Sequence, residues 1–209
     1  MPRKRRGPLI AFEGVEGAGK STQVELLRQA LEKAGHRVVT TREPGGTQVG
    51  ERVRSILLDP ASSLVPRAEA LLFAAARAQL VEQVIRPALE RGELVLCDRY
   101  LDSSLVYQGA ARGLGAEAVA AVNRFATGVL LPDLAVLLRL DPAEGLARGR
   151  GRRDRIEGQD LHFHRRVARG FLDLAAAEPE RFAVIDAAPP PDQVAAEVLA
   201  AVLHRLGRG

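Results

Sequence analysis

The stretch Gly14-Val15-Glu16-Gly17-Ala18-Gly19-Lys20-Ser21 matches the pattern G-x-x-x-x-G-K-[ST] of a phosphate-binding loop. An apolar run, Leu9 to Phe12, precedes it, and apolar residues with helical spacing follow it over 21–33. Glycines let backbone N–H groups converge on phosphate oxygens, and the start of a helix adds a favourable dipole. We therefore expect the loop and the adjoining Thr22 to hold a nucleoside triphosphate, with Lys20 on the outer phosphates and Ser21 on Mg²⁺.

Outward from this loop, apolar runs typical of strands alternate with segments typical of helices. An Asp141–Gly151 segment starts as a helix and then dissolves into arginines and glycines. The alternation favours an α/β fold, a five-stranded parallel sheet with helices on both faces and right-handed crossovers. The predicted strands are 9–13, 37–41, 94–97, 134–140 and 181–185, and the other predicted helices are 21–33, 49–58, 67–90, 116–127, 159–177 and 192–205.

Length and composition are those of one globular domain. The 209 residues are 46% hydrophobic and 27% charged, and Cys97 is the only cysteine, which excludes an intramolecular disulfide framework. No apolar run reaches the ~18 residues of a membrane helix, and the apolar run after the basic start is too short for a signal peptide. We expect a cytoplasmic protein, with a disordered basic tail at 1–7 and a single domain over 8–209.

Arginine dominates the positive charge. Of the 30 basic residues, only Lys4, Lys20 and Lys33 are lysines. Arginine makes forked contacts to phosphate, so this richness is compatible with nucleic acid, with phosphorylated small molecules, or with the composition of the source alone. Few aromatic residues argue weakly against single-strand binding by base stacking.

A second phosphoryl site is predicted at the end of the central apolar run. Asp98 and Arg99 follow Leu94–Cys97, and the carboxyl end of such a strand lies beside the phosphate loop. Asp98 can hold Mg²⁺, and Arg99 can neutralise a phosphate in transit. A switch GTPase would need an Asp-x-x-Gly and an Asn-Lys-x-Asp, and neither occurs. The sequence therefore favours a small-molecule kinase.

Four stretches together give a family resemblance over nearly the whole chain after residue 8: 12–22, 41–47 (TREPGGT), 71–77 (LLFAAAR) and 98–109 (DRYLDSSLVYQG). With them the sequence resembles thymidylate kinase, which implies the P-loop fold of nucleoside-monophosphate kinases, ATP and Mg²⁺ as cofactors, and transfer of the ATP γ-phosphate to dTMP to give dTDP, a step toward dTTP. The resemblance also implies a homodimer, for which the helix 67–90 is a plausible interface.

The resemblance also assigns roles to residues at matching positions. It implies that Phe73 stacks on the thymine ring, that Arg77 hydrogen-bonds the base, and that Tyr107 packs against the sugar. Glu16 resembles the acid that accepts a hydrogen bond from the 3′-hydroxyl of the sugar. The remaining implied contacts are Ser103 and Gln108 to the base, and Arg42, Arg54 and Arg99 to the monophosphate, with Glu43 shaping that site.

A run of arginines at 148–155 has two readings. Crowded like charges cannot fill a core, so we expect an exposed, mobile segment at about 146–158. It is either a solvated basic loop that could contact RNA, or a lid over the triphosphate. Because residue 17 is glycine, the sequence resembles the bacterial-type branch, in which the lid supplies the charge. Arg153 and Arg155 are the first choices for catalysis, with Arg148 and Arg152 behind them.

Two alternatives stay open from the residues alone. One is a kinase for another nucleotide or a nucleoside, and the other is an ATP-using protein that binds nucleic acid. The first reading commits to small-molecule substrates, dTMP and ATP, without nucleic acid or membrane partners. Dependence of ADP formation on dTMP, or on DNA or RNA, discriminates them.

Overall fold

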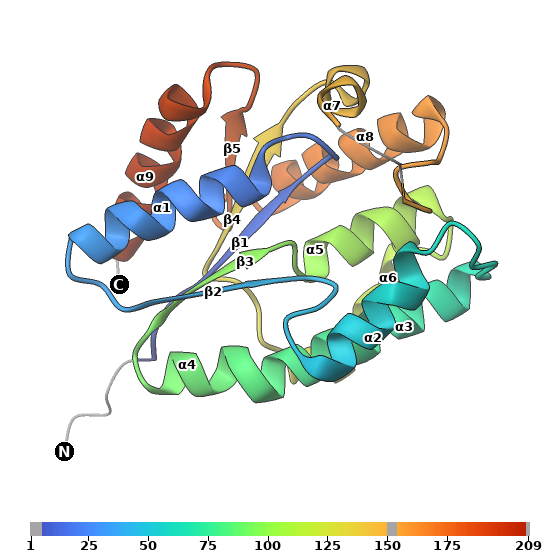
Figure 1. Ribbon diagram of the computed structural model, residues 1–209, viewed down its shortest axis with the longest axis horizontal. Coiled ribbons are helices and arrows are strands. Elements are labelled where there is room, and N and C mark those ends of the chain that lie inside the picture. The colour runs from blue at the N-terminus through green and yellow to red at the C-terminus, as the bar shows by residue number, and fades with distance from the viewer. Residues whose placement is uncertain (1–5, 150–153, 208–209) are drawn as a thin grey trace.

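The computed structural model describes residues 6–149 and 154–207. Its centre is a five-stranded parallel sheet with the order β2-β3-β1-β4-β5 (Figure 1). Leu9 of β1 pairs with Val95 of β3, and Ile10 pairs with Leu134 of β4. The α/β class and the parallel five-stranded sheet are thus confirmed. The strands are β1 Leu9–Gly14, β2 Val38–Arg42, β3 Leu94–Asp98, β4 Leu134–Arg139 and β5 Phe182–Asp186.

Helices cover both faces of the sheet (Figure 1). Helix α1 (Lys20–Lys33) lies beside α9 (Pro191–Gly207) on one face. The other face carries α8 (Leu161–Ala177) and the helices of the middle of the chain. These are α2 Gln48–Leu58, α3 Pro66–Leu80, η1 Val81–Ile85, α4 Arg86–Glu90, α5 Leu101–Ser104, η2 Leu105–Ala111 and α6 Ala116–Thr127; the short α7 (Pro142–Arg148) follows β4.

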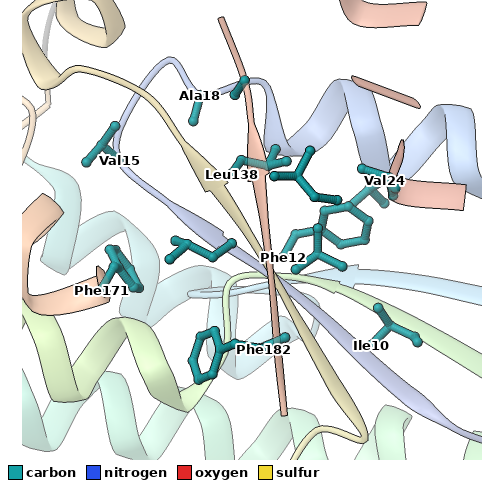
Figure 2. Packing of buried hydrophobic residues seen from close by; sticks show 14 of the residues in the cluster. Ile10, Phe12, Val15, Ala18, Val24, Leu138, Phe171 and Phe182 are labelled. Atoms are coloured by element: carbon teal, nitrogen blue, oxygen red, sulfur yellow. The ribbon is translucent and has the colours of Figure 1, made fainter. Parts of the chain in front are cut away.

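The central strand β1 is buried on both faces, as its unbroken apolar run predicts. Side chains alternate along it: Ile10 and Phe12 pack toward Val24 and other residues of α1, as Figure 2 shows. Leu9 and Ala11 belong to a second cluster with residues of η1 and α4. Because both faces are fixed by packing, the carboxyl end of β1 is a rigid platform for the loop that follows it.

Two helical segments differ from the predictions. The predicted helix 67–90 is continuous, but its residues Val81–Ile85 form a π-helical turn, η1. Pro87 explains it, because proline cannot donate a backbone hydrogen bond within a helix and its ring crowds the preceding turn. The helical stretch from Leu101 to Ala111 was not predicted at all. It is also partly π-helical, and its apolar spacing is interrupted by polar residues that face the site.

The start of the described chain is attached to the domain. Arg6 forms an ion pair with Asp133 at 2.9 Å, and the Gly7 N–H donates to the Leu89 carbonyl at 2.8 Å. Arg6 and Gly7 of the predicted tail therefore lie against the domain, while 1–5 lie outside the described residues. No helix in the described part of the chain is both long and apolar enough to cross a membrane.

Candidate active site

A cavity of about 310 Å³ opens at the carboxyl ends of β1, β2 and β3. Parallel strands present their carboxyl ends at one edge, which is where ligands bind in open α/β sheets. Residues predicted from five separate stretches of sequence meet here. Those that line the cavity are Glu16, Gly17, Lys20, Ser21, Arg42, Glu43, Arg54, Phe73, Arg77, Asp98, Arg99, Ser103, Tyr107 and Gln108.

The phosphate loop depends on glycines at its turns. Gly14, Gly17 and Gly19 all have positive φ angles. At Gly17 a Cβ atom would lie 2.0 Å from the Gly145 carbonyl oxygen of α7, which is closer than any side chain can be placed. Residue 17 therefore packs directly on the helix that leads into residues 149–158, and no arginine fits at this position.

Lys20 is held inside the loop. Its Nζ donates to the carbonyls of Val15 (2.7 Å) and Gly14 (3.1 Å). Burial, followed by the charge of Arg99, lowers the pKa of Lys20 to about 8. The ammonium is thus poorly compensated by the two carbonyls, and an anion beside it would stabilise its charge.

Ser21 and Asp98 form a pair of oxygen atoms below the loop. The Ser21 hydroxyl donates to Asp98 Oδ2 at 2.6 Å, joining the start of α1 to the end of β3. Hard oxygen donors of this kind suit Mg²⁺, which takes few protein ligands and completes its shell with phosphates and water. The described residues contain no group of three or more His, Cys, Asp or Glu side chains that could hold a metal. The pair therefore fits Mg²⁺ that is held jointly with a nucleotide.

Arg99 is fixed in the centre of the cavity wall. It adopts a left-handed backbone, φ 67°, which is strained for a residue other than glycine. Its Nη1 donates to the Gly14 carbonyl at 2.9 Å, and its Nη2 to Glu16 Oε1 at 3.0 Å. Burial alone would lower the pKa of Arg99, but the neighbouring Tyr107 and Glu16 raise it. The guanidinium is therefore a permanent charge between the loop and the rest of the cavity.

Glu16 is oriented from several sides. The Tyr107 hydroxyl donates to its Oε1 at 2.6 Å, and Nδ1 of the buried His164 lies 3.2 Å from its Oε2. Burial would raise the pKa of Glu16, but the adjacent His164 and Arg99 hold it below its ordinary value. Sequence reasoning missed His164, because nothing in the spacing of α8 marks this histidine as a neighbour of the phosphate loop.

At the opposite end of the cavity, Arg77 is almost fully buried, at 1% exposure. Its Nε donates to Glu43 at 2.7 Å and its Nη1 to Ser104 at 3.1 Å. Burial alone would lower the pKa of Arg77, but the Glu43 carboxylate raises it. The other N–H groups donate to Glu43, Asn123 and the Tyr100 carbonyl, so the protein satisfies the guanidinium completely.

Two further side chains define this end. Phe73 is half-buried one helical turn before Arg77 and lines the cavity. Gln108 is 1% exposed, and its Nε2 donates to Glu69 Oε1 at 2.9 Å. Glu69 was not predicted, since a lone glutamate near the start of a helix is usually solvated. Together Phe73 and Gln108 offer an aromatic face and an amide, which suits a planar polar ring.

Arg42 and Arg54 line the cavity from β2 and α2. Arg42 is exposed and pairs with Glu51 at 3.2 Å, while Arg54 Nη1 donates to the Pro44 carbonyl at 2.8 Å. Burial and then the charge of Arg42 lower the pKa of Arg54. The two positive charges repel each other, so an anion bound between Arg42 and Arg54 would stabilise both.

Of the four predicted lid arginines, Arg148 and Arg155 lie within the described residues. Arg153 and Arg152 fall outside the described residues. Arg155 does not line the cavity: its Nη1 donates to Glu69 Oε2 at 2.6 Å and its Nε to the Leu57 carbonyl at 2.8 Å. This geometry differs from the predicted reach toward transferred phosphate, because Glu69 offers Arg155 a buried counter-charge on α3.

A second cavity, of about 420 Å³, lies on the other side of the phosphate loop and was not predicted. Ala18, Gly19 and Thr22 of the loop line it together with Arg148 and the turn 187–191. Arg148 is fixed there by a hydrogen bond of 3.0 Å to the Ala187 carbonyl. The only sequence signal is the run of three prolines after the last strand, which resembles any surface turn.

Comparison with known proteins agrees with this geometry. The thymidylate kinase family model matches residues 12–198. A thymidylate kinase of Deinococcus radiodurans is 58% identical over 202 residues, covering 96% of this chain and 98% of its own, and one of Caldanaerobacter subterraneus is 52% identical, covering 87% and 88%. The crystal structure of thymidylate kinase from Ehrlichia chaffeensis superposes with a TM-score of 0.79 at 32% identity, covering 95% and 99%. The chain therefore belongs to the thymidylate kinase family, the enzymes that phosphorylate dTMP to dTDP for the synthesis of dTTP.

Proposed function

We propose that this chain uses ATP and Mg²⁺ to phosphorylate dTMP, with the thymine in the end of the cavity formed by Phe73, Arg77 and Gln108. The observation that carries the proposal is one cavity lined both by residues of the phosphate loop and by Phe73, Arg77 and Gln108. The acceptor phosphate then lies near Arg99, between the two ends. This arrangement supports direct transfer between two bound nucleotides.

ATP occupies the other side of the loop in this proposal. Its triphosphate lies along residues 14–22, and its base enters the second cavity beside Arg148. Backbone N–H groups and the start of α1 hold the phosphates. Lys20 leaves the carbonyls of Gly14 and Val15 and binds the outer phosphates, because a dianionic partner compensates its charge better than two dipoles.

Mg²⁺ is assigned to Ser21 and Asp98. When bound, it neutralises charge on the phosphates of ATP. Asp98 and Ser21 hold their oxygen atoms close together before any ligand arrives, so that the site needs little rearrangement. Through its hydrogen bond with Ser21, Asp98 also joins the end of β3 to the start of α1, where the two nucleotides meet in this proposal.

Each part of dTMP has a proposed partner. Gln108 faces the polar edge of the base, Ser103 lies beside it, and Phe73 lies against the ring, while Arg77, whose N–H groups donate to the protein, lines the same end of the cavity. Glu16 accepts a hydrogen bond from the 3′-hydroxyl. Tyr107, whose hydroxyl donates to Glu16, packs against the sugar. Arg42, Arg54 and Arg99 bind the monophosphate, and Glu43 shapes the site through Arg77.

Catalysis on this proposal is alignment and charge neutralisation. The phosphate oxygen of dTMP is already a nucleophile at neutral pH, so no general base is needed. Lys20 and Arg99 neutralise charge that develops on the transferred group. Because Gly17 cannot carry a side chain, further charge has to come from elsewhere, and Arg153 is the proposed source. The contacts of Arg155 favour a role in holding residues 154–158 against α2 and α3.

A homodimer is proposed on exposed apolar side chains. Phe125 of α6 is 94% exposed and Leu71 of α3 is 58% exposed, and these two helices pack together. Large apolar groups gathered on adjacent helices are typical of subunit interfaces. Sedimentation equilibrium tests the proposal: Phe125→Ser should shift a dimer toward monomer, and a wild-type monomer would contradict it.

The activity itself is tested by coupled measurement of ADP formation. We expect kcat/KM for dTMP to exceed that for dUMP by about 10–200-fold, because enclosing the 5-methyl gains about 1–3 kcal/mol. The preference over dCMP should be larger, because cytosine presents the opposite hydrogen-bonding pattern and leaves buried polar groups unpaired. Equal values for dTMP and dCMP would contradict base reading by Gln108, and stimulation by DNA or RNA alone would favour the nucleic-acid alternative.

A further inference from the structure

Glu69 is a buried carboxylate that the proposed reaction does not use. Its side chain is 2% exposed and lies on α3, below the base end of the cavity. It contacts three side chains from two segments: Gln108 of η2 and Arg112 just after it, and Arg155 near the end of the predicted lid. A carboxylate in such a place is costly unless every contact is satisfied, so its position calls for an explanation.

The carboxylate is held in its ionised form. Burial would raise the pKa of Glu69, but hydrogen bonds from Gln108 and Arg155 outweigh it and lower the pKa. Arg112 adds two contacts, at 3.2 and 3.3 Å. Two arginines therefore compensate one carboxylate, which stays an acceptor only.

An acceptor-only partner fixes the direction of the Gln108 amide. An amide has an NH₂ end and a carbonyl end of nearly equal size, and either end can face a neutral partner. Glu69 Oε1 accepts only the NH₂ end, at 2.9 Å, which leaves Oε1 of Gln108 as the acceptor on a side chain that lines the cavity. The ring N3 of thymine carries a hydrogen and can donate to this oxygen. N3 of cytosine carries a lone pair instead, so that two acceptors face each other without a hydrogen between them.

We propose that Glu69 is a positioning residue for base specificity, which locks Gln108 with its carbonyl toward the base and so excludes cytosine. This inference rests on the proposed function, in which Gln108 reads the base. Glu69 itself touches no substrate. Arg155, near the end of the predicted lid, donates to the same carboxylate that orients Gln108.

The test is the ratio of kcat/KM for dTMP to kcat/KM for dCMP, measured in one preparation, so that the fraction of active protein cancels. In Glu69→Gln the new amide can donate as well as accept, and Gln108 is free to reverse. We expect the ratio to fall about tenfold or more, since the wild-type protein leaves a buried polar group mispaired with cytosine and the variant does not. Glu69→Asp is the second variant, for use if Glu69→Gln does not fold. It keeps the charge, but its shorter side chain moves the carboxylate away from the Gln108 amide, so the ratio should fall in the same direction.

Three comparisons separate this role from a structural one. Arg155→Gln removes one of the two arginine contacts of Glu69 and should leave the ratio within about twofold of wild type. Glu82→Gln, which removes an exposed glutamate paired with Arg86, should do the same. In a Gln108→Ala background, which should itself have a low ratio, Glu69→Gln should have no further effect, because the two residues act as one unit.

The outcomes divide cleanly. A wild-type ratio in both Glu69 variants, together with a low ratio in Gln108→Ala, would overturn the role of Glu69 and leave the proposed function standing. An unchanged ratio in Gln108→Ala would overturn base reading by Gln108 and this inference with it. An equal loss from Glu69→Gln in both backgrounds would show that Glu69 acts by another route and would also overturn the inference.

Discussion

The two ends of the cavity are built in opposite ways. At the phosphate end, the cationic side chains have weak partners that a ligand can replace. Lys20 donates to two backbone carbonyls of the loop, and the positive charges of Arg42 and Arg54 repel each other. At the base end, Arg77 and Gln108 are buried and held by the carboxylates Glu43 and Glu69. Charges awaiting a ligand serve a reaction in which charge moves, whereas locked polar groups serve selection, because a fixed pattern rejects a mismatched base.

The largest expected effect lies at the base end and concerns stability. Arg77→Ala leaves the Glu43 carboxylate buried without its counter-charge, and breaking a buried pair costs about 3–5 kcal/mol. Urea unfolding at pH 7 measures this free energy. Arg169→Ala is the matched control, since Arg169 forms an exposed helical pair with Asp173 and its loss should leave the protein close to wild type. If the two variants unfold alike, Arg77 is not a structural element of the base end.

At the phosphate end the corresponding change affects rate. Lys20→Ala removes a side chain that contacts only the loop itself in this structure, so the fold should be kept. Losing one contact to developing charge should lower kcat by about 10²-fold or more, which corresponds to roughly 2.7 kcal/mol. Steady-state kinetics with saturating ATP and dTMP measure it, with circular dichroism as the check on folding. Retention of more than about a tenth of wild-type turnover would refute the assignment of Lys20.

The sequence predicted these two ends unequally. The phosphate end is local: the loop, its strand and its helix are contiguous, so residues 14–22 can be read from one motif. The base end was found only through resemblance, because Gln108 lies in η2 while Phe73 and Arg77 lie on α3, and spacing alone cannot bring the two helices together. Glu69 and His164 were missed for the same physical reason, since their partners are distant in sequence.

Secondary structure shows a similar division. All five strands were predicted. The three inner strands β1, β3 and β4 are short, mainly apolar and buried runs, whereas the edge strands β2 and β5 are short runs between helical segments and are only partly buried. The helical stretch 101–111 was not predicted, because its inward face is polar where it lines the cavity and periodicity depends on contrast between faces. A functional surface thus hides the pattern that would reveal the element carrying it.

A smaller effect is expected from Glu13, at the junction of the two ends. It accepts hydrogen bonds from the Tyr100 N–H (2.9 Å) and the Ser103 hydroxyl (2.6 Å), and it is fully buried. Burial, with the neighbouring Asp102, raises the pKa of Glu13 to about 8. Between pH 5 and 8 the folded protein keeps this proton while the unfolded chain loses it. The contribution of Glu13 to stability is therefore present at low pH and falls as pH rises, by about 1.4 kcal/mol per pH unit.

Glu13→Gln removes this titration. Urea unfolding at pH 5, 6, 7 and 8 should show a shallower decline of the free energy of unfolding in Glu13→Gln than in the wild type. Parallel curves for the two proteins would mean that Glu13 is ionised in the folded state, and that the junction resembles the phosphate end in holding charge.

The most direct test of the division between the two ends uses kcat and the dTMP-to-dCMP ratio of kcat/KM together, in Lys20→Ala and Gln108→Ala. Lys20→Ala should lower kcat for both substrates by the same large factor and leave the ratio within about twofold of wild type. Gln108→Ala should lower the ratio about tenfold or more, through loss of kcat/KM for dTMP. A ratio that collapses in Lys20→Ala, or one that survives in Gln108→Ala, would contradict the separation of catalysis from selection in this cavity.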